Sequence, residues 1–350
     1  MSAVAQLSTA HRVRAEWVAA LDDVPLALDV RAAGPGEVPL IAVGGGQEWL
    51  SIHDLEGDLV DRQVVPGGVL ALAWSAPQRI VAAGGTAGAW VWHEGRGVTQ
   101  VSTGWCSAVA WTGTGRLAVA AGRTASVLDP AAAGQLWSTP EQPSTVTDVL
   151  WLRDGRELAV AAYGGICAYT RGRRAPARHL PYAGSLLSAA ASPDGRWMIS
   201  GNQDASLHVW RLRDGAEFEM AGLPGKVSRV AFDASGRWLA ANSSAESTVW
   251  DFSGRGPAGT SPRVLTAHPD GATALAWHPA EPWLATGGAD GVLAVWDVTR
   301  AVPGRPQAPT WSATVAPAAR RGISAVTWSA GGAQVLVGTT DGDLAAYRVV

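Results

Sequence analysis

The stretch ATALAWHPAEPWLATGGADGVLAVWDV, residues 272–298, decides the fold. It begins with a short apolar segment that ends in Trp277 and continues through a turn into a second apolar segment, Trp283–Thr286. A Gly-rich turn then leads to a third segment, which ends in Trp296-Asp297. Short apolar segments bounded by Gly, Pro and Asp are typical of β-strands. The stretch therefore predicts three consecutive antiparallel strands joined by tight turns.

The same order of segments recurs along the chain, so internal repetition organises the protein. The residues that end the first strand of each unit lie between 37 and 51 residues apart, and the copy at residues 25–54 is the weakest. Repeats of about 40 residues with four short strands are typical of propeller blades, whose faces must be covered by neighbouring blades. The predicted blade cores are residues 25–54, 69–93, 106–129, 146–170, 186–211, 227–251, 272–298 and 323–349.

These repeats predict an all-β fold, a closed β-propeller of four-stranded antiparallel blades. We expect one domain over residues 11–350, preceded by a flexible N-terminus at residues 1–10. Eight blades are favoured, and seven is the alternative if residues 25–54 form no blade. The last unit ends directly after its third strand, whereas residues 11–17 (HRVRAEW) alternate as a strand does. We therefore expect this N-terminal strand to complete the last blade and close the ring.

The repeats resemble the WD40 repeat β-propeller family. The resemblance covers about residues 11–350 and implies the fold, but it says little about function, because one fold hosts many functions. The residues that carry it are the strand ends Trp296-Asp297 and Trp250-Asp251, the variants Trp210-Arg211 and Trp92-His93, and the turn Ser192-Pro193-Asp194-Gly195.

The resemblance also implies a structural set of hydrogen-bonding side chains in single units. In the seventh unit this set is His268, Thr286, Asp290 and Trp296. The fifth unit retains Ser200, Asp204 and Trp210, with Tyr182 in place of the histidine. The other units depart further from the pattern, so we expect the network to differ from blade to blade.

Large and small side chains alternate within each first strand, which places them on opposite faces of the blade. Trp74, Trp111 and Trp277 end three of these strands, and alanines occupy most of the alternate positions. Large-on-small packing lets twisted sheets approach each other closely near the ring axis. We expect these tryptophans to be buried, and removal of Trp277 to cost about 3–5 kcal/mol.

Composition limits the classes of function. The chain has 350 residues, 47% of them hydrophobic and 16% charged, which is typical of a globular protein. A formal net charge of −3 argues against nonspecific binding to nucleic acid or to a membrane surface. Every cationic residue except Lys226 is an arginine, and the arginines are scattered among turns and strand edges. We attribute their excess to a GC-rich genome rather than to a phosphate-binding surface.

Other features favour a cytoplasmic protein. Residues 1–10 lack the basic and apolar regions of a secretory signal, and the apolar runs are far shorter than the roughly 20 residues that a spanning helix needs. Two cysteines, Cys106 and Cys167, are too few for a disulfide framework. We expect a monomeric ring in the cytoplasm, without a membrane or nucleic-acid partner.

The sequence carries no strong signal for a cofactor, a metal or a catalytic residue. Residues 225–228 lack the pattern of a phosphate-binding loop, and the seven histidines fall in different units without metal-ligand spacing. Asp29, Asp148 and Arg229 lie on first strands, where they can form local hydrogen bonds or line a central channel. In the second case, a tunnel-based hydrolase or lyase, or a small-ligand sensor, is the alternative function.

The favoured function is a non-catalytic scaffold that binds a protein or a peptide. The family resemblance implies binding on the ring face where the first strands begin. The repeat explains the positions of 15 of the 18 tryptophans but not that of Trp105, which precedes a first strand. Trp, Tyr and Arg are frequent interface anchors. The predicted partner-binding residues are Trp105, Arg123, Tyr163, Lys226, Gln203, Leu70 and Leu187.

Overall fold

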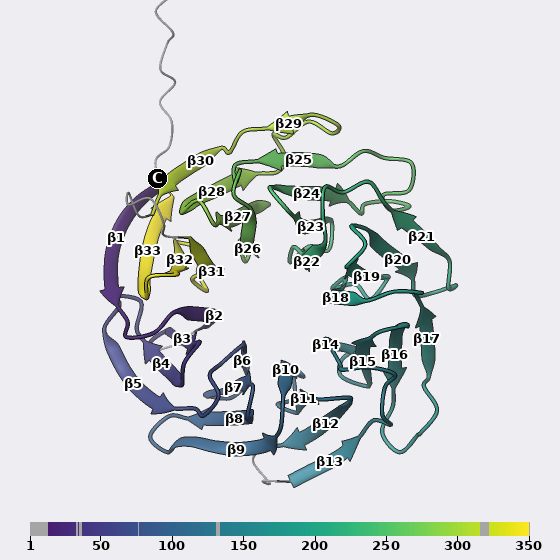
Figure 1. The fold of residues 1–350 in the computed structure, drawn as a ribbon, viewed down its shortest axis with the longest axis horizontal. Helices are drawn as coiled ribbons and strands as arrows, with labels where there is room; N and C mark the ends of the chain where they lie inside the picture. The colour runs from purple at the N-terminus through teal and green to yellow at the C-terminus, as the bar shows by residue number, and fades with distance from the viewer. Residues whose placement is uncertain are drawn as a thin grey trace, which may run out of the picture.

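The computed structural model describes residues 13–32, 34, 37–75, 77–130, 134–315 and 322–349. The predicted flexible segment, residues 1–10, lies outside this part of the chain, as do the first two residues of the predicted closing strand. The described residues form β-strands joined by turns and loops, without a helix. The strands build eight sheets arranged as a ring around a central axis, which confirms the predicted eight-bladed propeller (Figure 1).

The four strands that define each blade pair antiparallel, and the first of them lies nearest the axis (Figure 1). Blade 1 comprises β2 (Pro25–Arg31), β3 (Leu40–Gly45), β4 (Trp49–His53) and β5 (Leu59–Val64), and blade 2 comprises β6 (Ala71–Trp74), β7 (Ile80–Gly85), β8 (Gly88–His93) and β9 (Gly97–Thr103). Blade 3 comprises β10 (Cys106–Trp111), β11 (Leu117–Ala121), β12 (Thr124–Asp129) and β13 (Gly134–Ser138), and blade 4 comprises β14 (Asp148–Leu152), β15 (Glu157–Ala162), β16 (Gly165–Tyr169) and β17 (Arg178–Pro181). Residues 25–54 therefore belong to a complete blade, and the seven-bladed alternative is wrong.

The second half of the ring repeats this order. Blade 5 comprises β18 (Leu186–Ala191), β19 (Trp197–Asn202), β20 (Leu207–Arg211) and β21 (Glu217–Met220), and blade 6 comprises β22 (Val227–Phe232), β23 (Trp238–Ser243), β24 (Glu246–Asp251) and β25 (Arg263–Thr266). Blade 7 comprises β26 (Ala272–Trp277), β27 (Trp283–Gly288), β28 (Val292–Asp297) and β30 (Trp311–Thr314), and blade 8 comprises β31 (Ile323–Trp328), β32 (Gln334–Thr339), β33 (Asp343–Val349) and β1 (Val13–Ala20).

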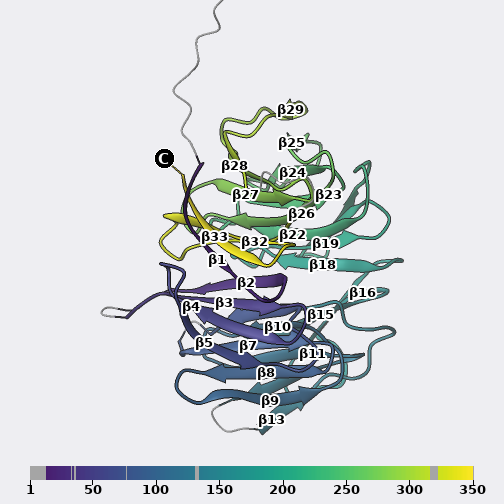
Figure 2. The same cartoon turned by 60° about the vertical axis from the view of Figure 1, so that its left-hand side comes forward.

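The N-terminal strand closes the ring, as predicted. β1 pairs antiparallel with β33, from Val13 opposite Val349 to Ala20 opposite Asp343, and becomes the outer strand of blade 8. The two strands lie side by side in both views (Figures 1 and 2). Trp17 then links blade 8 to blade 1, because its Nε1 donates a hydrogen bond to the Leu55 carbonyl at 2.7 Å. β1 therefore covers the edge of β33 that would otherwise be unpaired.

Tryptophans at the ends of first strands join neighbouring blades. The indole N–H donates to a main-chain carbonyl in the first strand of the preceding blade, at 2.8–3.2 Å. The pairs are Trp74 with Asp29, Trp111 with Ala73, Trp151 with Ala110, Trp277 with Ala231, and Trp328 with Ala276. Trp74 and Trp328 are buried, whereas the other three are half-buried.

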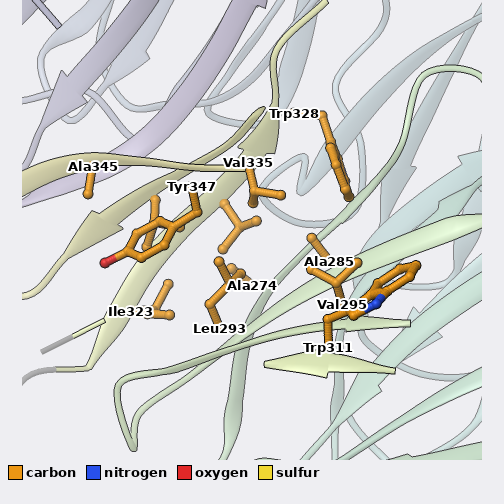
Figure 3. Packing of buried hydrophobic residues seen from close by; sticks show 12 residues of the cluster. Ala274, Ala285, Leu293, Val295, Trp311, Ile323, Trp328, Val335, Ala345 and Tyr347 are labelled. Atoms are coloured by element: carbon orange, nitrogen blue, oxygen red, sulfur yellow. The ribbon is translucent and has the colours of Figure 1, made fainter. Parts of the chain in front are cut away.

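The hydrophobic core lies between blades rather than within a single sheet. Figure 3 shows the junction of blades 7 and 8, where Leu293 and Val295 of β28 lie near Val335 of β32 and Tyr347 of β33. Alanines of the inner strands leave room for the large residues of the neighbouring blade, as the alternating pattern predicts. Each blade therefore depends on its neighbours for burial of its faces.

Two long connections extend blades 6 and 7. Each connection precedes the outer strand of its blade, β25 in blade 6 and β30 in blade 7. The sequence did not predict the short strand β29 (Pro306–Gln307) within the second connection. β29 pairs in parallel with β25, so the insertion of blade 7 adds a fifth strand to blade 6.

Candidate functional site

Antiparallel pairing gives the ring two different faces. We call the face on which the first strands begin the top face. The turns between the second and third strands lie on the same face, so that in blade 3 Trp105, which precedes the first strand, and Arg123, in the turn, are neighbours. On the bottom face the first strands end, and the turns between third and fourth strands lie there as well. The residues predicted from the strand starts therefore belong to the top face.

Three of the predicted residues lie on the top face of the neighbouring blades 3 and 4. Trp105 and Tyr163 are 48% and 54% exposed, and the side chain of Arg123 is 53% exposed. The Gly122 amide donates to the Trp105 carbonyl at 2.9 Å, so Trp105 lies beside the turn that carries Arg123. We call Trp105, Arg123 and Tyr163 the Trp105 patch.

Hydrogen bonds hold the segment that connects the two blades under this patch. Arg123 Nε donates to the Gln142 carbonyl at 2.8 Å, and the Gln142 amide donates to the Arg123 carbonyl at 2.8 Å. Two residues further on, Ser144 Oγ accepts from the Tyr163 amide at 2.9 Å. The main chain beneath the Trp105 patch is therefore fixed, while its large side chains remain exposed.

The remaining predicted residues are divided between two places. Lys226, directly before β22, and Gln203, directly after β19, are exposed on the top face of blades 6 and 5 and therefore lie in other blades than the Trp105 patch. Leu70 and Leu187 are half-buried and line the central channel. The structure does not bring these four residues together with Trp105.

The central channel has a volume of about 350 Å³ and is lined by first-strand residues of all eight blades. Its wall consists mainly of Ala, Leu, Val, Ser and Thr, and Asp148 and Arg229 are its charged residues. Hydroxyl groups at the mouth join neighbouring blades. Ser107 Oγ donates to the Val146 carbonyl at 2.5 Å, and Thr273 Oγ1 donates to the Ile323 carbonyl at 2.6 Å.

Two aspartates on first strands also join blades. Asp148 accepts from the Val149 amide at 2.9 Å and, across the junction, from the Ala189 amide of blade 5 at 3.0 Å. Asp29 does the same with the amides of Val30 and of Trp74 in blade 2, at 2.8 and 2.7 Å. Burial raises the pKa of each carboxyl to about 6. Both carboxylates are thus used in structural hydrogen bonds.

The hydrogen-bonding set of blade 7 connects an outer loop to the second and third strands. His268 Nε2 lies 2.8 Å from Thr286 Oγ1, and Trp296 Nε1 donates to the same oxygen at 3.0 Å. His268 Nδ1 lies 3.3 Å from a carboxylate oxygen of Asp290. Burial lowers the pKa of His268, which favours its neutral imidazole. These four side chains therefore have a structural role.

Blade 5 replaces this set with a different network. The Tyr182 hydroxyl donates to Asp204 and lies 3.1 Å from Ser206 Oγ, which itself donates to Asp204 at 2.7 Å. Within the described part of the chain, the buried Ser200 hydroxyl and Trp210 indole N–H have no hydrogen-bond partner. Tyr182 thus contacts the aspartate, as His268 does in blade 7, but it makes no hydrogen bond to Ser200, so the part of the network formed by Ser200 and Trp210 is incomplete.

The described residues contain no group of three or more His, Cys, Asp or Glu side chains that could hold a metal ion. No helix that is long and apolar enough to cross a membrane occurs in the same part of the chain. A groove on the bottom face of blades 3 to 5, where arginines from separate turns converge, was not predicted from the sequence. Its one local signal is the arginine-rich segment 171–178, RGRRAPAR.

Comparison with known proteins gives matches to repeat proteins. The family model described as WD domain, G-beta repeat, matches residues 178–211 and 259–297. Actin-interacting protein 1 of Caenorhabditis elegans is 25% identical over 149 residues, which are 42% of this chain and 24% of that protein. Small ribosomal subunit protein RACK1 of Schizosaccharomyces pombe is 23% identical over 135 residues, 35% of this chain and 40% of that protein. The matches thus span about a quarter and two-fifths of these relatives.

Solved structures share the fold over most of the chain. The computationally designed Ika8 protein superposes with a TM-score of 0.75 at 19% identity, over 97% of this chain and 100% of the designed one. A chain of the mitotic checkpoint complex gives a TM-score of 0.63 at 19% identity, over 80% of this chain and 90% of its own length. At this identity the likeness shows the architecture alone.

Proposed function

Because the chain belongs to the WD40 repeat β-propeller family, we propose that it is a non-catalytic scaffold that binds a protein or a peptide on its top face. The observation that carries this proposal is the Trp105 patch, in which an indole, a phenol and a guanidinium stand about half exposed on a fixed main chain. Trp, Tyr and Arg contribute most of the binding free energy in many protein interfaces. A partner that covers this patch would remove its apolar area from water.

The names of similar proteins support a protein partner. One relative is called an actin-interacting protein, and one structural neighbour is part of a mitotic checkpoint complex. Lys226 and Gln203 extend the proposed surface to blades 6 and 5 for a partner large enough to span the ring. Leu70 and Leu187 would contact only a segment that enters the channel mouth.

The central channel supports a scaffold more than an enzyme. Asp148 and Asp29 both accept two main-chain hydrogen bonds, which hold their carboxylates in the blade junctions. The alternative, a hydrolase, lyase or ligand sensor in the channel, depends on Arg229, whose side chain is exposed there. Metal analysis of the purified protein and a thermal-shift screen with metabolites would test that alternative.

The proposal is tested by affinity purification from the native host, followed by identification of co-purified proteins by mass spectrometry. The double variant Trp105→Ala/Arg123→Glu should lose the partner while its melting temperature stays within a few degrees of wild type. The matched control is Val302→Ala/Arg305→Glu, which also changes an exposed apolar residue and an exposed arginine, but in blade 7. Retention of the partner by the Trp105 variant would refute the assignment.

The proposal includes a monomeric ring in the cytoplasm. Cys106 and Cys167 are both free thiols, and Cys106 is buried, where burial raises its pKa to about 12 and makes it unreactive. Light scattering after size-exclusion chromatography should give the monomer mass of 36.2 kDa. A mass of twice this value would contradict the monomer, and localisation of a tagged chain checks the compartment.

A further inference from the structure

A groove runs across the bottom face of blades 3 to 5. It consists of two adjoining cavities of about 840 and 450 Å³, which share a wall formed by Thr114, Trp151 and residues 154–156. We call it the bottom groove. Turns between first and second strands of three blades form its floor, and the turns after the third strands of blades 4 and 5 form its rim.

The bottom groove is basic, although the whole chain carries a net charge of −3. Seven arginines line it, against the three acidic residues Asp154, Glu157 and Asp194. Two more exposed arginines, Arg173 and Arg174, stand on the loop at its rim. Positive charge is therefore concentrated on one sector of one face, where it creates a local field for an anionic partner.

Some of these arginines are held by the fold. The carboxylate of Glu157, which is buried, accepts from Arg153 at 2.9 Å and from Arg178 at 3.0 Å. Arg178 also donates to the Leu212 carbonyl of blade 5 at 2.8 Å, so it joins blades 4 and 5. Arg196 is anchored to the Gly254 carbonyl of blade 6 at 2.7 Å. These residues shape the bottom groove.

Other arginines remain free. Arg116, Arg156 and Arg171 are exposed, and no acidic side chain in the described part of the chain forms an ion pair with them. All three line the smaller cavity. Their guanidinium groups are the donors that the bottom groove offers, and a guanidinium binds a carboxylate through two parallel hydrogen bonds.

Two tryptophans and two residues with an unusual backbone conformation lie among these arginines. Trp151 and Trp137 are half-buried and line the same cavity, and the Trp151 indole is fixed by its hydrogen bond to the Ala110 carbonyl. Arg153 and Asp154 have φ values of 50° and 55°, in the left-handed region that non-glycine residues rarely adopt. Such conformations cluster at binding sites, where surrounding structure maintains them.

We propose that the bottom groove is a second binding surface, which takes an extended acidic segment of a protein, rich in Asp and Glu and carrying an apolar side chain. Its carboxylates would pair with Arg116, Arg156 and Arg171, and its apolar side chain would pack on Trp151. The site lies on the face opposite the Trp105 patch and does not depend on the top-face function.

An acidic peptide fits better than a nucleic acid. Asp154, which is exposed, lies in the shared wall of the two cavities and would repel a continuous phosphate backbone. A peptide, by contrast, places its carboxylates at separate positions and can avoid this side chain. The net charge of −3 also weakens the long-range attraction on which nucleic-acid binding relies.

The test uses the full chain and a fluorescein-labelled ten-residue peptide with six Asp or Glu residues and two Leu residues. Fluorescence anisotropy should show saturable binding that weakens as salt rises. The same peptide with Asn and Gln in place of the acids should bind at least tenfold more weakly. Equal binding of the two peptides would overturn the proposal, as would tenfold tighter binding of a single-stranded RNA of ten nucleotides.

Two matched variants locate the site. Arg156→Glu/Arg171→Glu should weaken binding of the acidic peptide at least tenfold, because it replaces two free donors by repelling charges. Arg96→Glu/Arg305→Glu makes the same change in charge on exposed residues of blade 2 and of the blade 7 insertion, and it should change the affinity less than twofold. Equal losses in both variants would show attraction by net charge alone and refute a binding surface at the bottom groove.

Discussion

At five of the eight blade junctions, a tryptophan at the end of a first strand donates its indole N–H to a carbonyl of the preceding blade. Trp277 makes this bond with Ala231 at 2.9 Å and packs against the core shared by blades 6 and 7. Because it is half-buried rather than fully buried, Trp277→Ala should cost about 3 kcal/mol, the lower end of the range expected from the sequence.

The contribution of the hydrogen bond can be separated from that of packing. Trp277→Phe retains most of the apolar contact and leaves the Ala231 carbonyl without its donor, so we expect a loss of about 1 kcal/mol. Urea unfolding of the wild type and both variants measures the two costs. If Trp277→Phe lowered the free energy of unfolding as much as Trp277→Ala does, a packing role for the indole would be contradicted.

Asp148 gives the junction of blades 4 and 5 a dependence on pH. Its pKa is raised to about 6 by burial, above that of the same carboxyl in the unfolded chain. The folded protein therefore binds more protons between pH 4 and 6, and the stability that this group contributes is greatest below about pH 4 and is lost as pH rises through 6.

We expect the difference in unfolding free energy between wild type and Asp148→Asn to fall by on the order of 2 kcal/mol from pH 4.5 to pH 7.5. Denaturant unfolding of both proteins at several pH values measures this difference and cancels the contributions of other carboxyls. Asp29→Asn, at the junction of blades 1 and 2, should behave in the same way. A difference that does not change with pH would show that Asp148 has an ordinary pKa.

At the scale of the element, the strand that closes the ring determines stability. β1 forms the outer edge of blade 8, and Glu16 accepts a hydrogen bond from Gln334 Nε2 at 2.6 Å in addition to the pairing with β33. Deletion of residues 1–18 removes most of this strand and the Trp17 link to blade 1, so it should lower the melting temperature by more than 10 °C.

Truncation of residues 1–12 is the matched control, because it leaves β1 in place. Thermal unfolding followed by far-UV circular dichroism compares both truncations with the full chain. An unchanged melting temperature after deletion of residues 1–18 would contradict closure by the N-terminal strand. Trp17→Ala should have a smaller effect in the same direction, since it removes only the link to Leu55.

The strands were predictable because each repeat carries its own pattern of short apolar segments and turns. β29 was not, since two residues, Pro306 and Gln307, have no periodicity and pair only because the insertion folds back on blade 6. The position of Leu187 depends on a shift of register between Leu186 and Ser188, which sequence alternation cannot show. Such bulges redirect a side chain, here into the channel wall.

The two candidate sites also differ in how far they could be predicted from the sequence. Trp105 stood out because the repeat left it without a structural position, and the structure shows its side chain about half exposed. The bottom groove gave no such signal, because Arg116, Arg156 and Arg171 come from three separate turns that converge only when blades 3 and 4 pack together. Arginines that are scattered along a chain can therefore form one surface, and the attribution of their excess to genome composition does not account for this clustering.

For the whole molecule, the ring holds the two proposed surfaces apart. First strands of about six residues, at 3.3 Å per residue, separate the top and bottom faces by about 20 Å. Changes at sites that far apart, without shared contacts, usually have additive effects. We therefore expect the Trp105 patch and the bottom groove to bind independently, so that one propeller can hold two partners at once.

This independence is measured with the two double variants and their combination. Trp105→Ala/Arg123→Glu should leave the affinity for the acidic peptide within twofold of wild type, and Arg156→Glu/Arg171→Glu should leave capture of the top-face partner unchanged. The fourfold variant should lose both interactions while still unfolding in one cooperative transition. Loss of both interactions in either double variant would indicate one shared surface or a misfolded ring, and the unfolding transition distinguishes these two outcomes.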